Sequence, residues 1–162
     1  MRDAWKRWTF ALTANTYING EQSLKSSSVS GSISATRVTD ALKVNASVHG
    51  DYSSNSFAVQ QGRNVVSHQR SFGFTAIVAP SVNQHMSIGV RMSGVSSTFL
   101  NQTLTLRVAP AIELNAFRYS EANRRMLIVE YSAGVTAFDY EERTLFGKLS
   151  ERLPSHHLLV SL

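Results

Sequence analysis

Residues 42–53, LKVNASVHGDYS, alternate between apolar and polar side chains, and this alternation restricts the possible folds more than any other feature of the chain. One set of positions holds small, aliphatic and aromatic residues: Leu42, Val44, Ala46, Val48, Gly50 and Tyr52. The other set holds polar and charged residues: Lys43, Asn45, Ser47, His49, Asp51 and Ser53. A period of two predicts a β-strand whose two faces meet different surroundings. The stretch also exceeds the usual strand length of about five or six residues.

The same pattern recurs along the chain and predicts seven complete strands and the start of an eighth. The strands are expected at 8–18, 28–38, 42–53, 67–79, 85–94, 102–117, 125–140 and 156–162. Segments 19–27, 54–66 and 141–155 are expected to be long loops, whereas 39–40, 80–84 and 119–124 are expected to be short turns. Pro110 lies inside an expected strand and removes a backbone donor, so a bulge or local break is expected there.

Long strands of this kind, with polar faces rich in Ser, Thr and Asn, are typical of a transmembrane β-barrel. Hydrophobic residues make up 43% of the chain, yet no apolar run approaches the roughly 20 residues of a membrane-spanning helix. A closed barrel satisfies every backbone group in lipid without helices. We therefore predict an all-β fold, an antiparallel up-and-down transmembrane β-barrel with about eight strands present. Residues 1–162 are expected to form a single β-barrel domain that is a fragment of a longer barrel.

Aromatic residues gather near the ends of the expected strands, where the aromatic girdles of a membrane barrel lie. The predicted girdle comprises Trp5, Trp8, Tyr17, Tyr52, Phe117, Tyr119, Phe138 and Tyr140. Membrane lipid is therefore the expected partner of the apolar faces, with the short turns on the periplasmic side.

The charged residues of the polar faces are expected to point into the barrel, because a charge at mid-depth in lipid costs about 2–4 kcal/mol. The predicted inward-facing set is Lys43, His49, Asp51, Arg91, Arg107, Glu113 and Glu130. Glu130 is the expected partner of either Arg91 or Arg107. These side chains would either select small solutes in a polar lumen or fill and stiffen a narrow barrel.

Three stretches carry a resemblance to known proteins: RVTDALKVNASVHGDY, LTLRVAPAIELNAFRYSEANRR and GVTAFDYEERTLFGKLSERLP. They resemble bacterial outer-membrane β-barrel proteins, close to the salt-induced outer-membrane protein family. None of the three contains a motif with an assigned chemistry. The resemblance implies a place in the bacterial outer membrane and a structural or porin-like, solute-passage role without catalysis.

No cofactor, metal site or catalytic residue is expected. The chain has no cysteine, and its histidines do not follow the spacing of zinc ligands. The net charge of +5 comes from basic residues scattered singly, apart from Arg124 and Arg125, so nucleic acid is not an expected partner.

Two alternatives stay open from the sequence. A soluble lipocalin-like ligand-binding β-barrel also alternates apolar and polar residues. A barrel-embedded lipid hydrolase or acyltransferase would use His49 and Asp51, two apart on one face, with one of the many serines as nucleophile.

Overall fold

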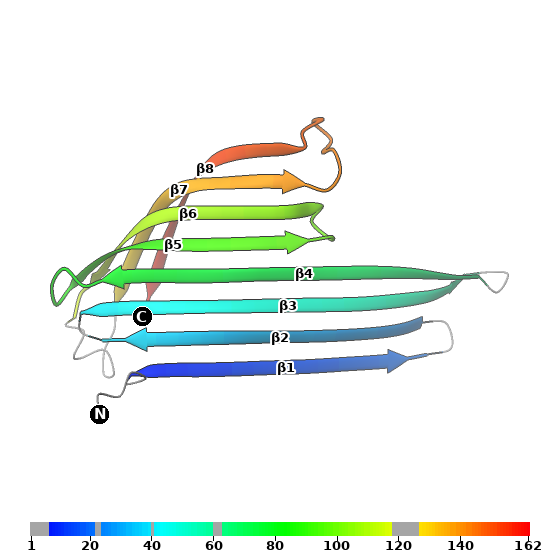
Figure 1. The fold of residues 1–162 in the computed structure, drawn as a ribbon, viewed down its shortest axis with the longest axis horizontal. Coiled ribbons are helices and arrows are strands. Elements are labelled where there is room, and N and C mark those ends of the chain that lie inside the picture. Colours follow the sequence, from blue (N-terminus) through cyan, green and yellow to red (C-terminus); the bar gives the residue numbers. More distant parts are fainter. Residues whose placement is uncertain (1–6, 22–23, 40, 60–62, 118–126) are drawn as a thin grey trace, which may run out of the picture.

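The computed structural model describes residues 7–21, 24–39, 41–59, 63–117 and 127–162. Eight strands form one antiparallel sheet in which each strand pairs with its neighbours in sequence (Figure 1). The predicted all-β, up-and-down architecture is therefore confirmed. No helix in the described ranges is long and apolar enough to cross a membrane. The strands are β1 (Trp8–Gly20), β2 (Leu24–Val38), β3 (Leu42–Val59), β4 (Arg63–Pro80), β5 (Met86–Ser97), β6 (Gln102–Asn115), β7 (Ile128–Tyr140) and β8 (Ser150–Ser161).

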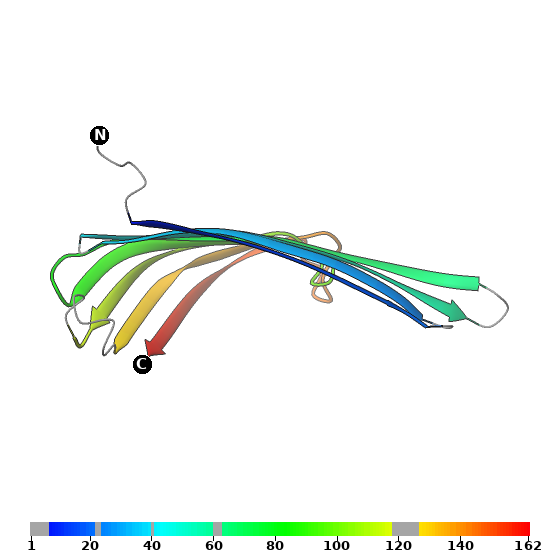
Figure 2. The ribbon, with the colours of Figure 1, turned by 90° about the horizontal axis from the view of Figure 1, so that it is seen from below.

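The sheet is open. In the described part of the chain β1 pairs only with β2, and β8 pairs only with β7. Figure 2 shows a curved sheet in which β5–β8 bend away at one end from the flatter β1–β4. An open, curved, up-and-down sheet is consistent with an incomplete barrel.

The two faces of the sheet are buried in the reverse of the soluble pattern. On β6 every second residue from Ala109 to Asn115 is buried, whereas the apolar residues between them are exposed. Glu113 is 5% exposed, while its apolar neighbours Ile112 and Leu114 are 46% and 51% exposed. We call the side that carries Glu113 the polar face and the opposite side the apolar face. The polar face is the one toward which the sheet curves, because side chains from strands that are not neighbours meet on it.

Residues 42–53 have the two faces that their alternation predicts. Val48 on the apolar face is 42% exposed. Lys43 on the polar face reaches a carboxylate and leaves 34% of its side chain exposed. The aliphatic residues of this strand therefore do not form a closed core.

Several predicted strand boundaries are wrong, most often because strands continue where alternation stops; by contrast, β6 ends at Asn115 instead of at residue 117, and β7 starts at Ile128 instead of at residue 125. Most of 54–66 is strand, since β3 runs to Val59 and β4 starts at Arg63. β2 starts at Leu24, inside the expected loop 19–27, and β8 starts at Ser150, inside the expected loop 141–155. In these stretches Ser, Asn and charged residues occupy both faces, so the alternation is lost, although the backbone ladder continues from Ser54 to Val59.

The expected alternation of long and short connections is also wrong. The connections 21–23, 39–41 and 60–62 are all short, and the longest, 116–127, lies at the end of the sheet where only short turns were expected. Connection length therefore does not distinguish the two ends of this sheet.

Pro110 causes a gap in pairing without a bulge. The β6–β7 ladder passes from Val108–Val135 to Ala111–Ser132 in unchanged register, and the intervening pairs are missing. The register shifts lie elsewhere, between Val95 and Ser97 and between Gln102 and Leu104.

Two glycines on the polar face allow neighbouring strands to approach closely where the sheet bends. A Cβ added at Gly89 would lie 2.3 Å from the Val78 carbonyl oxygen and 2.7 Å from the Ala79 Cβ. At Gly134 it would lie 2.1 Å from the Val108 carbonyl oxygen and 2.6 Å from the Ala109 Cβ. A glycine inside a strand often marks such a tight bend or close backbone approach.

Candidate functional site on the polar face

An ion pair crosses the polar face between strands that are not neighbours. The Lys43 Nζ on β3 lies 2.6 Å from the Glu113 Oε2 on β6. In a flat sheet these strands are three spacings, or about 14 Å, apart. Ala79 is the cross-strand partner of Lys43 and lies close to Gly89 on the next strand, and the small size of both residues leaves room for the lysine side chain to reach Glu113. The pair therefore depends on both the curvature and the small residues beneath it.

A second ion pair joins Arg91 on β5 to Glu130 on β7. The guanidinium donates from Nε at 3.0 Å and from Nη2 at 2.6 Å to Oε1, and from Nη2 at 2.8 Å to Oε2. Such geometry uses the fixed fork of arginine and strengthens the contact. The structure thus selects Arg91 from the two partners that the sequence allowed for Glu130.

Arg107 binds hydroxyl groups instead of a carboxylate. Its Nε donates to the Ser155 Oγ on β8 at 3.0 Å, and its Nη2 donates to the Ser132 Oγ at 3.2 Å. The Thr136 hydroxyl donates to the same Ser155 oxygen at 3.0 Å. Arg107 reaches across β7, where Gly134 is the cross-strand neighbour of Ser155.

The two carboxylates at the centre of this network are direct cross-strand neighbours, Glu113 opposite Glu130. Like charges opposite one another destabilise a sheet, so this pair depends on the two cations that reach it. Both carboxylates are almost fully buried, at 5% and 2% exposure. Asn115, two residues along β6, is also buried, and its Nδ2 has no hydrogen-bond partner among the described residues.

The hydrolase arrangement proposed for His49 and Asp51 does not form among the described residues. No hydrogen bond joins the His49 imidazole to Asp51 or to a serine hydroxyl. Instead the ring lies over Gly73, its cross-strand partner, where an added Cβ would meet the imidazole Cε1 at 2.5 Å. His49 therefore fills the space left by a glycine.

The polar face of β2–β5 differs from that of β5–β8, because it holds an open hollow of about 400 Å³. Serine hydroxyls from neighbouring strands line it, together with the Asp51 carboxylate, the Gln69 amide and the Phe99 ring. Within the described residues neither Asp51 nor Gln69 has a side-chain hydrogen bond. These groups are free to bind water or a polar solute.

The predicted aromatic girdle divides between the two faces. Trp8 and Tyr52 lie on the apolar face, where the Arg37 guanidinium covers the Trp8 ring with a centroid distance of 5.9 Å. Tyr17 and Phe138 lie in register with polar-face residues, so they do not belong to an apolar-face band.

The other girdle residues lie at the ends of the strands. Tyr140 stacks on Phe138 and donates to the Glu151 carboxylate at 2.7 Å, and Phe117 follows the end of β6. Trp5 and Tyr119 lie outside the described residues.

All seven residues predicted to face inward lie on the polar face: Lys43, His49, Asp51, Arg91, Arg107, Glu113 and Glu130. Sequence reasoning missed Ser132, Ser155 and the small residues beneath the cations. In the sequence, only the small size of alternate residues such as Ala109 and Ala111 indicates where such contacts form. This pattern cannot be interpreted until the strands are placed side by side.

No protein-family model, curated protein or solved structure matches the chain. In the described ranges no group of three or more His, Cys, Asp or Glu side chains is placed to hold a metal ion.

Proposed function

We propose that this chain is the strand-forming part of a bacterial outer-membrane β-barrel with a structural or solute-passage role and no catalysis. The apolar face would lie in lipid, and the polar face would line the interior. The observation that carries the proposal is the reversed burial, in which Glu130 and Ser132 are 2% and 1% exposed while Val135 on the same strand is 53% exposed. The resemblance to proteins near the salt-induced outer-membrane protein family points the same way.

Lipid is the environment of lowest free energy for the apolar face. Exposed large apolar side chains occur on every strand, and many of them are cross-strand partners on the apolar face, such as Ile33 and Val48. A contiguous apolar surface of this kind is costly in water and marks a membrane or protein contact. A soluble lipocalin-like barrel would instead bury these residues in its core, whereas a sheet that curves toward the polar face leaves them on its outer side.

In the part of the chain that the structure describes, the outer edges of β1 and β8 are open, and a sheet in lipid cannot leave them unpaired. Nearly every residue of β1 is exposed on both faces, and its outer backbone groups have no partner strand among the described residues. In lipid each unpaired backbone group costs several kcal/mol. Membrane insertion therefore requires the outer edges of both β1 and β8 to be paired, so that the barrel closes.

Different parts of the polar face fit the structural role and the solute-passage role. On β5–β8 the charge network fills the concave side, which stiffens the sheet and leaves little room for solute. On β2–β4 the hydroxyl-lined hollow stays open and would admit water and small polar solutes. Solutes would pass along the polar face of β2–β4.

The absence of cysteine allows each face to be tested with a single label. One cysteine replaces Val135 on the apolar face, and another replaces Ser93 on the polar face. Each variant is refolded in lipid vesicles and labelled with an environment-sensitive fluorophore. We expect a lipid-borne quencher to act on the label at 135 and a water-soluble quencher to act on the label at 93.

Two further measurements separate the alternatives. Monodisperse behaviour without detergent, with the label at 135 shielded from both quenchers, would contradict the proposal and support the soluble barrel. Heat-modifiable mobility on a gel supports a folded membrane barrel, and conductance in a planar bilayer then distinguishes solute passage from a purely structural role.

A further inference from the structure

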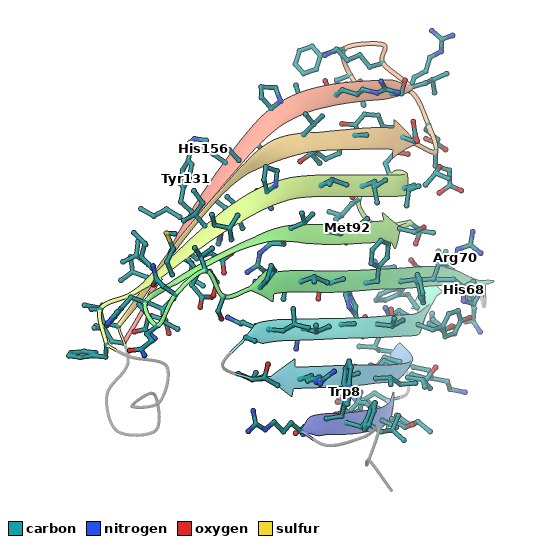
Figure 3. The ribbon with its side chains drawn as sticks, turned by 60° about the vertical axis from the view of Figure 1, so that its left-hand side comes forward. Trp8, His68, Arg70, Met92, Tyr131 and His156 are labelled. Carbon is teal, nitrogen blue, oxygen red and sulfur yellow. The ribbon has the colours of Figure 1, made fainter. Side chains whose placement is uncertain are left out.

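A cationic and aromatic cluster interrupts the apolar face near one end of β4. The side chains of that face run from Val78 through Phe74 and Phe72 and then change to Arg70 and His68. Figure 3 shows Arg70 and His68 together at this end of the strand. Tyr52 on β3 is the cross-strand partner of Arg70, so all three polar groups lie beside one another.

Two side chains of the cluster, Tyr52 and His68, bind each other, whereas the Arg70 side chain has no partner among the described residues. The Tyr52 hydroxyl and the His68 Nδ1 are 2.9 Å apart, and the two rings stack with centroids separated by 6.0 Å. The backbone of Arg70 is held by Thr98, which it contacts through both its N–H and its carbonyl. By contrast, the Arg70 guanidinium has no hydrogen-bond or ion-pair partner among the described residues. Its donors are free to bind an external anion.

An apolar hollow of about 260 Å³ lies on the same face, one row of cross-strand partners away from the Tyr52–Arg70 pair. Its floor is formed where Gly31 and Gly50 face each other across β2 and β3, and Phe72 closes one side. Tyr52 lies two residues beyond Gly50 on β3, and its cross-strand partner Arg70 lies two residues from Phe72 on β4. The Arg70 guanidinium therefore borders the apolar hollow.

We propose that this hollow and cluster form a binding site for an anionic, phosphate-bearing membrane lipid. Arg70 would bind the phosphate with its planar fork of donors, assisted by the Tyr52 and His68 pair, and an acyl chain would occupy the hollow over Gly31 and Gly50. Charge complementarity decides the occupant, since a free guanidinium bordering an apolar hollow matches an anionic headgroup joined to a hydrocarbon chain. This inference rests on the proposed membrane location.

The test measures which lipids stay with the protein. The chain is folded in phosphatidylcholine vesicles that contain a minor fraction of phosphatidylglycerol, extracted in mild detergent, and the retained lipids are quantified by mass spectrometry. We expect phosphatidylglycerol to be enriched over its share of the bilayer by about fivefold, the factor that one basic side chain contributes near an anionic membrane surface.

Two variants and one control locate the effect. Arg70→Gln removes the cation and should abolish the enrichment. Gly50→Leu fills the hollow, where an added Cβ meets only ordinary contacts at 3.8 Å or more, and should reduce it. Arg37→Gln is the matched control, because Arg37 is a cation of the same face that lies over Trp8 at the opposite end of the strands. It should leave the enrichment unchanged.

The outcomes separate this inference from the proposed function. Equal enrichment in wild type and Arg70→Gln, in a chain that still floats with the vesicles, would overturn the lipid site alone. Retention of inorganic phosphate as strong as that of the lipid would show an anion site without an acyl-chain contribution and would also overturn it. Failure of the wild-type chain to float with the vesicles would remove the membrane location itself.

Discussion

Gly89→Ala should destabilise the sheet strongly, although alanine is normally the better residue inside a strand. The added Cβ would lie 2.3 Å from the Val78 carbonyl oxygen and 2.7 Å from both the Cα and the Cβ of Ala79. These are backbone atoms or a fixed methyl group, so no side-chain rotation relieves the overlap. Strands β4 and β5 would have to separate at the bend, where Lys43 crosses to Glu113. We expect a loss of about 2–3 kcal/mol, in the range of overpacked cores.

Gly50→Ala is the matched control. Its nearest neighbours would be the Phe72 Cδ2 at 3.8 Å and the Ser71 carbonyl oxygen at 3.9 Å, which are ordinary contacts. The replacement of glycine by alanine in a strand should then stabilise by about 0.5–1 kcal/mol. The two variants are therefore expected to differ by about 3 kcal/mol.

The difference is measured as the urea midpoint of unfolding in detergent micelles, followed by the loss of the heat-modifiable gel band. The m-values of the two variants should agree, so that the midpoints report stability. Equal midpoints for Gly89→Ala and Gly50→Ala would refute the close approach of β4 and β5 and, with it, the proposed cause of the bend.

Two further predictions concern the charge network and the two faces. Arg91→Met leaves the buried Glu130 carboxylate without its partner and should cost about 2 kcal/mol, below the figure for a fully buried pair because 31% of the Arg91 side chain is exposed. Glu130→Gln in the same chain should recover part of that loss, and a double-mutant cycle without coupling would contradict the pairing. Val90→Lys on the apolar face should cost about 2–4 kcal/mol in lipid, whereas Ser93→Lys on the polar face should change stability by at most about 0.5 kcal/mol. Similar losses for both lysine variants, measured by urea unfolding in lipid vesicles, would argue against lipid on the apolar face.

The strand pattern could be read from the sequence because a strand has only two faces. Alternation assigned Val48 to one face and Lys43 to the other, and the register agrees. It failed between 54 and 66, where polar residues occupy both faces and only the backbone ladder reveals a strand. The same failure hid the start of β8, where Glu151 and Arg152 precede Pro154.

Pairing across the polar face was predictable only in part. The sequence allowed Arg91 or Arg107 as the partner of Glu130, because parity alone does not show how far neighbouring strands are shifted. Lys43 with Glu113 was not expected, since the two lie on strands separated by two others. That contact exists only because the sheet curves and because Ala79 and Gly89 are small.

By itself, then, the sequence determined the fold class, the up-and-down order and the face on which the predicted inward-facing residues such as Lys43, Arg91 and Glu113 lie, since alternation with a period of two is a local property of the chain. The tertiary structure alone decided which charges meet, where the sheet bends, how far the strands extend and that the apolar hollow borders Arg70. Each of these depends on register and curvature, which arise between strands and leave no local pattern in any one of them.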